Sequence, residues 1–319
     1  MKRAAGLFSG PAGVALLSLA YLVVTSPFVP GFASPRNLGN VFSNYFPLLA
    51  VSLGQTLVLL TGGIDLSVTA VIALASVAGA HVMTSDGGVL PGNAAAGVAA
   101  MLAVGLAVGL VNGLAVARLR MPPFLATLAV MTFASGFAIW ATGSRGISGL
   151  PAGFRGLGAR LAGSLPLSLV LVVPLVVAAH LVLRRTVAGR WLYAVGGNAA
   201  TARVSGVPVE RVLVLAYAAC GLCAAVASVL FTARVETGSP VLGQRIFLDV
   251  IGGAVIGGTS LFGGRGSVLG TAFGVLFISL VDNSLYLLGL TSFTILMVKG
   301  AVILAAAVLD ALRERVFGR

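Results

Sequence analysis

Charged side chains are scarce in this sequence, at 9% of its 319 residues. A soluble domain carries about 25% charged residues, so the composition excludes an ordinary soluble fold. The charges that remain are mostly basic and give a formal net charge of +12. They occur singly or in pairs between apolar runs, without interleaved aromatic residues. This distribution indicates membrane topology rather than binding of nucleic acid.

Side chains that commonly perform chemistry are also rare. The two histidines, His81 and His180, lie far apart, and no group of His, Cys and carboxylate residues has the spacing of a metal site. The two cysteines, Cys220 and Cys223, lie one turn apart in an apolar segment, which favours packing over redox chemistry. The phosphate-binding pattern Gly-x-x-x-x-Gly-Lys-Ser/Thr is missing. We therefore expect no enzyme, no metal and no cofactor bound by this chain, including ATP.

What the sequence does contain is long apolar runs. Hydrophobic residues make up 58% of the chain, and the mean hydropathy is +1.08. Membrane β-strands would alternate apolar and polar residues, and no such alternation occurs. Since many runs approach the ~20 residues that a helix needs to cross a bilayer, we predict an all-α polytopic membrane helical bundle with about ten transmembrane helices. The predicted segments are 11–29, 42–61, 64–83, 94–117, 124–142, 164–183, 212–232, 248–262, 267–288 and 293–311.

The basic residues predict the orientation of the bundle. With the N-terminus inside, thirteen of the 20 Lys and Arg fall in cytoplasmic segments, six fall outside, and Lys299 lies within the last segment. This asymmetry favours cytoplasmic N and C termini. The first apolar run resembles a signal peptide but is long enough to span, so we predict an uncleaved helix. The longest polar breaks are then an external loop at 143–163 and a cytoplasmic loop at 184–211 within a single membrane domain, 1–319.

The 43 glycines predict close helix packing. Residues 61–66 (TGGIDL) and 256–261 (IGGTSL) also hint at an internal repeat. Small residues repeated every four positions let helix backbones approach each other in lipid. Two such sets occur, Gly105, Gly109 and Gly113 in one and Gly253 and Gly257 in the other.

The cytoplasmic loop carries a polar, glycine-framed segment. Residues 199–204 are predicted to form a short helix, because Asn198 can accept hydrogen bonds from its first-turn amides. Gly206 can adopt the left-handed conformation that ends a helix. From the residues alone, this segment is equally explained as an ordinary connector or as a surface gripped by another protein.

Five ordered motifs between about residues 40 and 305 carry a family resemblance. The chain resembles the permease subunits of bacterial ribose-, xylose- and galactose-type ABC importers. The motifs are Gly54-Gln55-Thr56, Gly62-Gly-Ile-Asp-Leu-Ser-Val68, Asn112-Gly113 with Pro122-Pro-Phe-Leu-Ala-Thr-Leu128, Gly196-Gly197-Asn198 with Ser205-Gly206, and Val255-Ile-Gly-Gly-Thr-Ser-Leu-Phe-Gly-Gly-Arg-Gly266.

The resemblance implies a type II importer-like permease in the bacterial inner (plasma) membrane, surrounded by lipid. It implies a dimer with a second permease copy or a paralogue, a sugar delivered by an extracytoplasmic binding protein, and cytoplasmic ABC ATPase subunits that bind the ATP. It also implies that the glycine-framed segment is the coupling helix seated in the ATPase. The coupling residues would be Gly196, Gly197, Asn198, Ala202, Arg203, Ser205 and Gly206.

Polar residues within the apolar segments are candidates for the translocation path, because a buried polar group in a membrane is costly. They could hydrogen-bond sugar hydroxyls or join helices, and the sequence leaves both roles open. Asp65 could also cap the helix that follows it, and Lys299 could snorkel or pair with Asp282 or Asp249. The path candidates are Gln55, Asp65, Asn112, Thr127 and Asn283.

Three positions depart from the pattern of the family. Ala199 stands where Glu is usual, Ser135 where Arg is frequent, and Phe247 where Glu is frequent. These changes leave the predicted class of permease intact. They argue against assuming that its ATPase partner or its substrate is that of a well-studied family member. The alternative is an ion-coupled secondary transporter of a small polar solute, for which Asp65 and Asp282 are the candidate coupling carboxylates.

Overall fold

The computed structural model describes residues 10–85, 87–159 and 165–317. Within these ranges the fold is all-α, with one isolated bridge between Ile147 and Gly238, which confirms the predicted fold class. The helices are α2 (Pro11–Thr25), α3 (Pro35–Leu60), α4 (Val68–Met83), α5 (Ala94–Ala117), α6 (Pro123–Thr142), α7 (Ala152–Arg155), the 3-10 turn η1 (Gly156–Gly158), α8 (Ser168–Arg185), α9 (Val187–Gly197), α10 (Ala199–Val204), α11 (Val209–Val235), α12 (Phe247–Ile256), α13 (Val268–Leu287) and α14 (Ser292–Phe317).

Local capping residues set several of these helix limits. Ser34 accepts a hydrogen bond from the Asn37 amide at the start of α3, and Asn93 accepts one from the Ala96 amide at the start of α5. Gly143 ends α6 in the left-handed conformation, at φ 55°. Each of the ten predicted segments overlaps one helix. The largest extension is at α3, which begins at Pro35 rather than at residue 42 because Ser34 starts the helix within a polar stretch.

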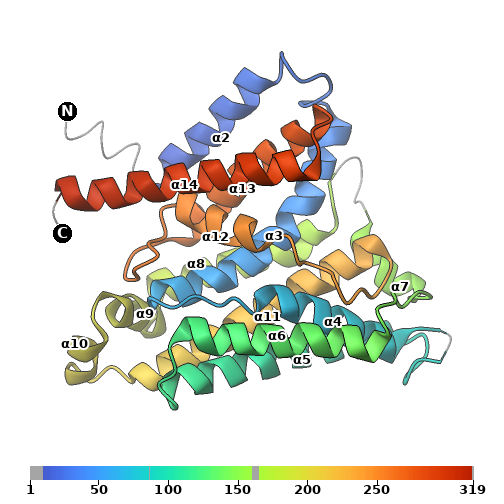
Figure 1. Cartoon of the computed structure of the whole chain (residues 1–319), viewed down its shortest axis with the longest axis horizontal. Helices are drawn as coiled ribbons and strands as arrows, with labels where there is room; N and C mark the ends of the chain where they lie inside the picture. The colour runs from blue at the N-terminus through green and yellow to red at the C-terminus, as the bar shows by residue number, and fades with distance from the viewer. Residues whose placement is uncertain (1–9, 86, 160–164, 318–319) are drawn as a thin grey trace.

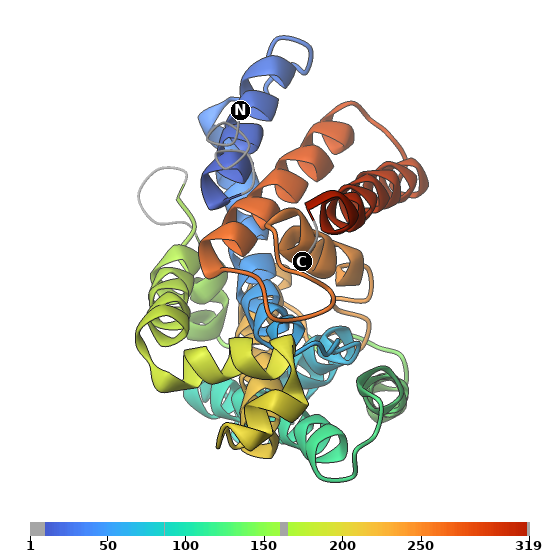
Figure 2. The same ribbon diagram turned by 90° about the vertical axis from the view of Figure 1, so that its left-hand side faces the viewer.

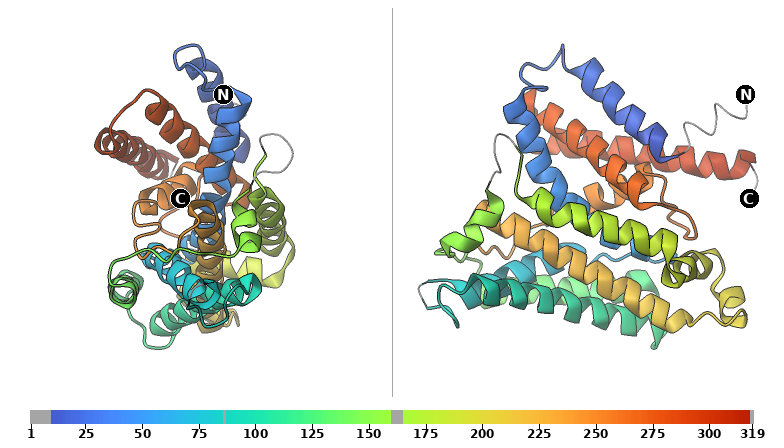
Figure 3. Two further views of the ribbon diagram at one scale, coloured as in Figure 1. Left: turned by 90° about the vertical axis from the view of Figure 1, so that its right-hand side faces the viewer. Right: turned by 180° about the vertical axis from the view of Figure 1, so that it is seen from behind.

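The helices form two groups joined by α3. Figure 2 shows α2, α13 and α14 on one side of the bundle and α4, α5 and α6 on the other. Helix α11 packs against α5, α3 and α4. Seen from behind, α8 crosses α3, and α2 lies against α13 (Figure 3). Helices α9 and α10 lie at one end of the bundle and α7 at the other (Figure 1).

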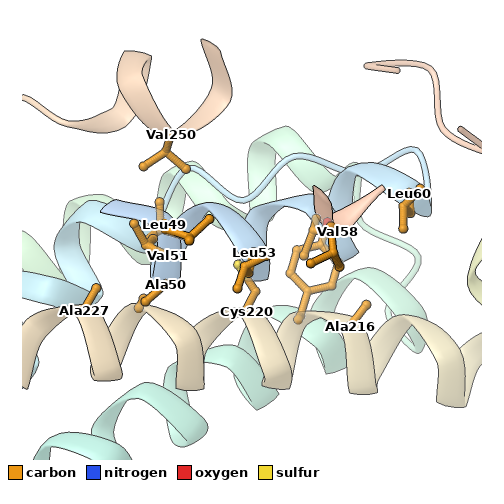
Figure 4. Close-up of a cluster of buried hydrophobic side chains, with 14 of the residues drawn as sticks. Leu49, Ala50, Val51, Leu53, Val58, Leu60, Ala216, Cys220, Ala227 and Val250 are labelled. Atoms are coloured by element: carbon orange, nitrogen blue, oxygen red, sulfur yellow. The ribbon is translucent and has the colours of Figure 1, made fainter. Parts of the chain in front are cut away.

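Small residues allow the central helices to touch through their backbones. A β-carbon at Gly105 would lie 2.4 Å from the carbonyl oxygen of Gly221, and one at Gly54 would lie 2.7 Å from Cβ of Cys223. Figure 4 shows Leu53 of α3 directly above Cys220 of α11. Both cysteines are free and buried, which agrees with the packing role expected of them.

Several helices have the length and hydrophobicity of membrane-spanning helices. Among the described residues, six helices are long and apolar enough to cross a bilayer, namely α3, α5, α6, α8, α11 and α13. Four shorter apolar helices lie at Pro11–Thr25, Val68–Met83, Phe247–Ile256 and Ser292–Ala306. The number of helices that cross and the side of each terminus stay predictions.

The predicted external loop is tied to its neighbours over the part that the structure describes. Ile147 exchanges two backbone hydrogen bonds with Gly238, and the Thr84 hydroxyl donates to the Ser148 carbonyl at 2.7 Å. Phe154 of α7 is fully buried. Residues 160–163 of the predicted loop lie outside the described residues. The described part is therefore a packed structure rather than a free loop.

Candidate functional site

The predicted short helix of the cytoplasmic loop is present as α10. The Asn198 side chain accepts a hydrogen bond from the Thr201 amide at 2.9 Å, and Gly206, at φ 83°, follows the last turn. Ala202 is buried, whereas Val204 is 91% exposed. The remaining predicted coupling residues are exposed or half-buried, namely Gly196, Gly197, Asn198, Arg203, Ser205 and Gly206. Helix α10 thus presents a mostly uncovered surface at one end of the bundle.

Helix α9 fixes this surface to two distant loops. A β-carbon at Gly196 would lie 1.8 Å from the Leu60 carbonyl oxygen and 2.5 Å from the Gly264 amide nitrogen. The Gly264 amide itself donates to the Leu60 carbonyl at 3.0 Å. We call this contact of Leu60, Gly196 and Gly264 the glycine junction. It brings together residues that flank the two segments hinting at an internal repeat, and it joins both to α9.

Tyr193 adds a side-chain bond to the same contact. Its hydroxyl donates to the Gly266 carbonyl at 2.9 Å. Burial raises the pKa of Tyr193, against a smaller lowering by the positive charge of Arg184, so the hydroxyl stays protonated and able to donate. This bond joins α9 to the loop that follows α12.

Four of the five predicted path residues meet at the start of α4. An Asp65 carboxylate oxygen accepts from the Ser67 amide at 2.8 Å and from the Asn112 amide group at 3.4 Å. Gln55, with its amide oriented to satisfy both partners, donates to the Asp65 carbonyl at 3.1 Å. The Thr127 hydroxyl lies 3.3 Å from the carbonyl oxygen of Ile64, next to Asp65, and also donates to the Pro123 carbonyl of its own helix at 2.9 Å. All four side chains are at most 1% exposed.

Asn283, the fifth predicted path residue, lies apart from these four. It exchanges two hydrogen bonds with Asn37, at 2.7 and 3.1 Å, across 246 positions of sequence. Both asparagines line a cavity of about 580 Å³. The cavity lies between α3, α11, α12 and α13, and its residues are Asn37, Asn40, Val41, Asn44, Leu48, Phe231, Arg234, Ile246, Asp249, Ile278, Ser279, Asp282, Asn283, Tyr286 and Leu287.

A triad of ion-paired side chains, two of them buried, borders this cavity. Lys299 of α14 lies 2.9 Å from carboxylate oxygens of both Asp249 and Asp282. The Lys299 and Asp249 side chains are 9% and 11% exposed, whereas that of Asp282 is 47% exposed. Of the alternatives open from sequence, the structure shows pairing with both carboxylates rather than snorkelling. The triad joins α14 to α12 and α13.

The sequence reasoning missed Asn40, Asn44 and Arg234. Arg234 donates to the Asn44 side chain, which joins the end of α11 to α3. The available signal was the spacing of Asn37, Asn40 and Asn44, which places them along one side of a helix. It was overlooked because the predicted helix began at residue 42.

The three departures from the family pattern lie in different places. Ala199 is exposed at the first position of α10. Ser135 is half-buried within α6. Phe247 is the first residue of α12 and packs against the main hydrophobic core. Only Ala199 therefore lies on the α10 surface.

The fold defines a helical membrane protein, and comparisons with known proteins identify its family. The family described as "Branched-chain amino acid transport system / permease component" matches residues 37–307, and the chain belongs to it. The chain is 41% identical to the ribose import permease protein RbsC of Bacillus subtilis (strain 168), over 91% of this chain and 89% of that protein. It is 37% identical to RbsC of Escherichia coli (strain K12), over 93% and 92% of the two chains.

A further relative is the L-arabinose transport system permease protein AraH of Escherichia coli (strain K12), at 33% identity over 95% of this chain and 91% of that protein. No solved structure matches the chain. Family membership confirms the predicted importer permease subunit and its multi-pass location in the bacterial inner (plasma) membrane. It favours this class over an ion-coupled carrier.

Proposed function

We propose that the chain translocates a monosaccharide that an extracytoplasmic binding protein delivers, in a transporter driven by separate ATPase subunits. The observation that carries this proposal is the similarity, over nine-tenths of the chain, to permeases named for ribose import and for L-arabinose transport. The partner subunits bind the ATP, and the permease needs no cofactor and no catalytic site of its own. A second copy or a paralogue completes the membrane part.

Coupling to the ATPase is proposed to pass through α10. Its exposed surface is at one end of the bundle, where a soluble subunit can reach it (Figure 1). A displacement of α10 moves α9, to which it is packed. Because Gly196 touches the Leu60 carbonyl, that motion reaches the end of α3 directly. The helices around the translocation path are then moved relative to each other.

The four polar residues around Asp65 contribute to this motion in our proposal. Gln55, Asn112 and Thr127 each bond to residues 64–67. Together they hold the 61–67 segment, which connects the glycine junction to α4. The segment therefore follows the end of α3 as a unit. The start of α4 would therefore keep its shape while a sugar moves past it.

Transport in proteoliposomes tests the function. The tagged chain is purified from native membranes in mild detergent with the subunits that accompany it, and reconstituted with ATP inside the vesicles. We expect uptake of labelled D-ribose or L-arabinose that depends on ATP and on added binding protein, and that a protonophore does not reduce. Uptake that needs an ion gradient and not ATP would establish the ion-coupled carrier, with Asp65 and Asp282 as the first carboxylates to substitute.

A further inference from the structure

The cavity between α3, α11, α12 and α13 has the size and composition of a sugar site. We propose that it is a weak binding site for a neutral monosaccharide, entered from the end of the bundle opposite α10. The inference rests on the proposed function and adds the place and the residues of binding. It concerns a site formed within one chain.

Size and position suit this role. The volume of about 580 Å³ falls within the range of about 300–1,000 Å³ typical of small-molecule sites. Its walls come from the first turns of α3 and the last turns of α11 and α13. Those turns lie at the end of the bundle away from α10 (Figure 1). A sugar released by a binding protein at that end would therefore be released on the same side as the cavity.

Several polar groups of the cavity wall have hydrogen-bonding capacity to spare. The Asn44 oxygen accepts from Arg234, while its amide nitrogen has no protein partner among the described residues. The Ser279 hydroxyl likewise has no hydrogen bond to the described part of the chain. One Asp282 oxygen pairs with Lys299, which leaves the second oxygen as an acceptor. Donors and acceptors on facing helices match the paired hydroxyls of a sugar.

The charges of the cavity favour a neutral ligand. Asp249 and Asp282 are offset by Lys299, which bridges them, and by Arg234 on the opposite wall. Two acidic and two basic groups sum to no net charge, so neither an anion nor a cation is selected. Because Lys299 holds one oxygen of Asp282, it is a positioning residue for that carboxylate.

Apolar side chains complete the site. Phe231 and Ile246 line the cavity beside the polar groups, and Tyr286, which is 72% exposed, lies at its α13 wall. Such surfaces suit the C–H face of a sugar ring, while the polar groups fix its hydroxyls. Weak binding is expected because a transported molecule must also leave.

Protection of an introduced thiol tests binding separately from transport. The full chain carrying Asn44→Cys is reconstituted and labelled with a membrane-impermeant maleimide; the native cysteines are buried and serve as the low background. D-ribose and L-arabinose are expected to slow labelling at position 44, whereas L-leucine is not. Ser148→Cys, in the exposed loop at the same end, is the control and should label at one rate in all conditions.

Uptake kinetics provide the second measurement. Asn44→Ala and Ser279→Ala are each expected to raise the KM for the sugar about 2- to 10-fold, the loss of one neutral hydrogen bond. Ser43→Ala is the matched control, because its hydroxyl bonds to the Gly39 carbonyl of its own helix. Normal uptake without protection and without a KM change would overturn the site alone. Protection without ATP-driven uptake would support the site and overturn the proposed function.

Discussion

Gly196 of α9 lies against the carbonyl oxygen of Leu60, the last residue of α3, with no room for a β-carbon between them. The two residues belong to segments far apart in the sequence. Their contact joins the helix pair that carries the exposed α10 surface to a helix that runs through the centre of the bundle. A rigid contact of this kind can transmit a movement without any side chain.

Substitution of Gly196 tests that transmission. Gly196→Ala must push α9 away from Leu60 and Gly264, and overpacking of this kind typically costs about 1–3 kcal/mol of folding free energy. The direct contact between α9 and the end of α3 is then lost, so a displacement of α10 no longer moves α3 by the same amount. We expect ATP-driven uptake, measured in proteoliposomes, to fall at least about tenfold.

Gly136→Ala, within α6, is the control, because a β-carbon there meets nothing within 4 Å. It should leave uptake and thermal stability close to those of the native chain. Equal uptake by the two variants would show that the glycine junction does not transmit the motion.

The α10 surface gives a second prediction. Val204 is 91% exposed, so Val204→Asp should not unfold the bundle. Binding of the ATPase to the α10 surface would remove water from the added carboxylate, which is costly without a compensating partner. We therefore expect the affinity for the ATPase to fall about tenfold or more. Co-purification of the ATPase and its ATP hydrolysis rate are the measurements. Val187→Asp, on an exposed position of α9, is the control. Unchanged association in Val204→Asp would mean that the ATPase binds elsewhere.

The ion triad predicts that removing its cation alone destabilises the protein more than removing the cation together with the buried carboxylate. Lys299→Met removes the cation from two carboxylates, of which Asp249 is buried, and breaking a buried pair typically costs about 3–5 kcal/mol. The melting temperature in detergent should fall clearly. The double variant Lys299→Met with Asp249→Leu should recover much of the loss, because no buried charge is left unpaired. A double variant less stable than the single one would contradict this account.

Thiol labelling tests the orientation of the bundle. Ser148 and Arg203 are both exposed. Ser148 shortly precedes α7 and Arg203 lies in α10, and these two helices lie at opposite ends of the bundle (Figure 1). In sealed cells, Ser148→Cys should react with an impermeant reagent, whereas Arg203→Cys should react only after the membrane is opened. The reverse result would place α10 outside the cell and would exclude coupling to a cytoplasmic ATPase.

The positions of the helices can be predicted from this sequence, whereas the contacts between polar side chains mostly cannot. The segment 94–117 was predicted with the limits that α5 has, since Asn93 and an unbroken apolar run mark them. The start of α3 was missed because its first turns are polar, and with it the row of asparagines in the cavity. Gln55, Asp65, Asn112 and Thr127 were noticed singly as polar residues in apolar surroundings. That Gln55, Asn112 and Thr127 all bond to the segment around Asp65 depends on how α3, α5 and α6 meet.

The long apolar runs of the sequence are sufficient to predict a membrane-spanning helical bundle. A chain in lipid must satisfy its backbone groups internally, so long apolar runs dictate helices whatever their neighbours are. Family motifs, read in order, determined the class of transporter. Only the tertiary structure decided which polar groups meet, because contacts such as Asn37 with Asn283, 246 positions apart, depend on helix packing. The cavity, the ion triad and the glycine junction all arise from such long-range contacts, and no local pattern of residues encodes them.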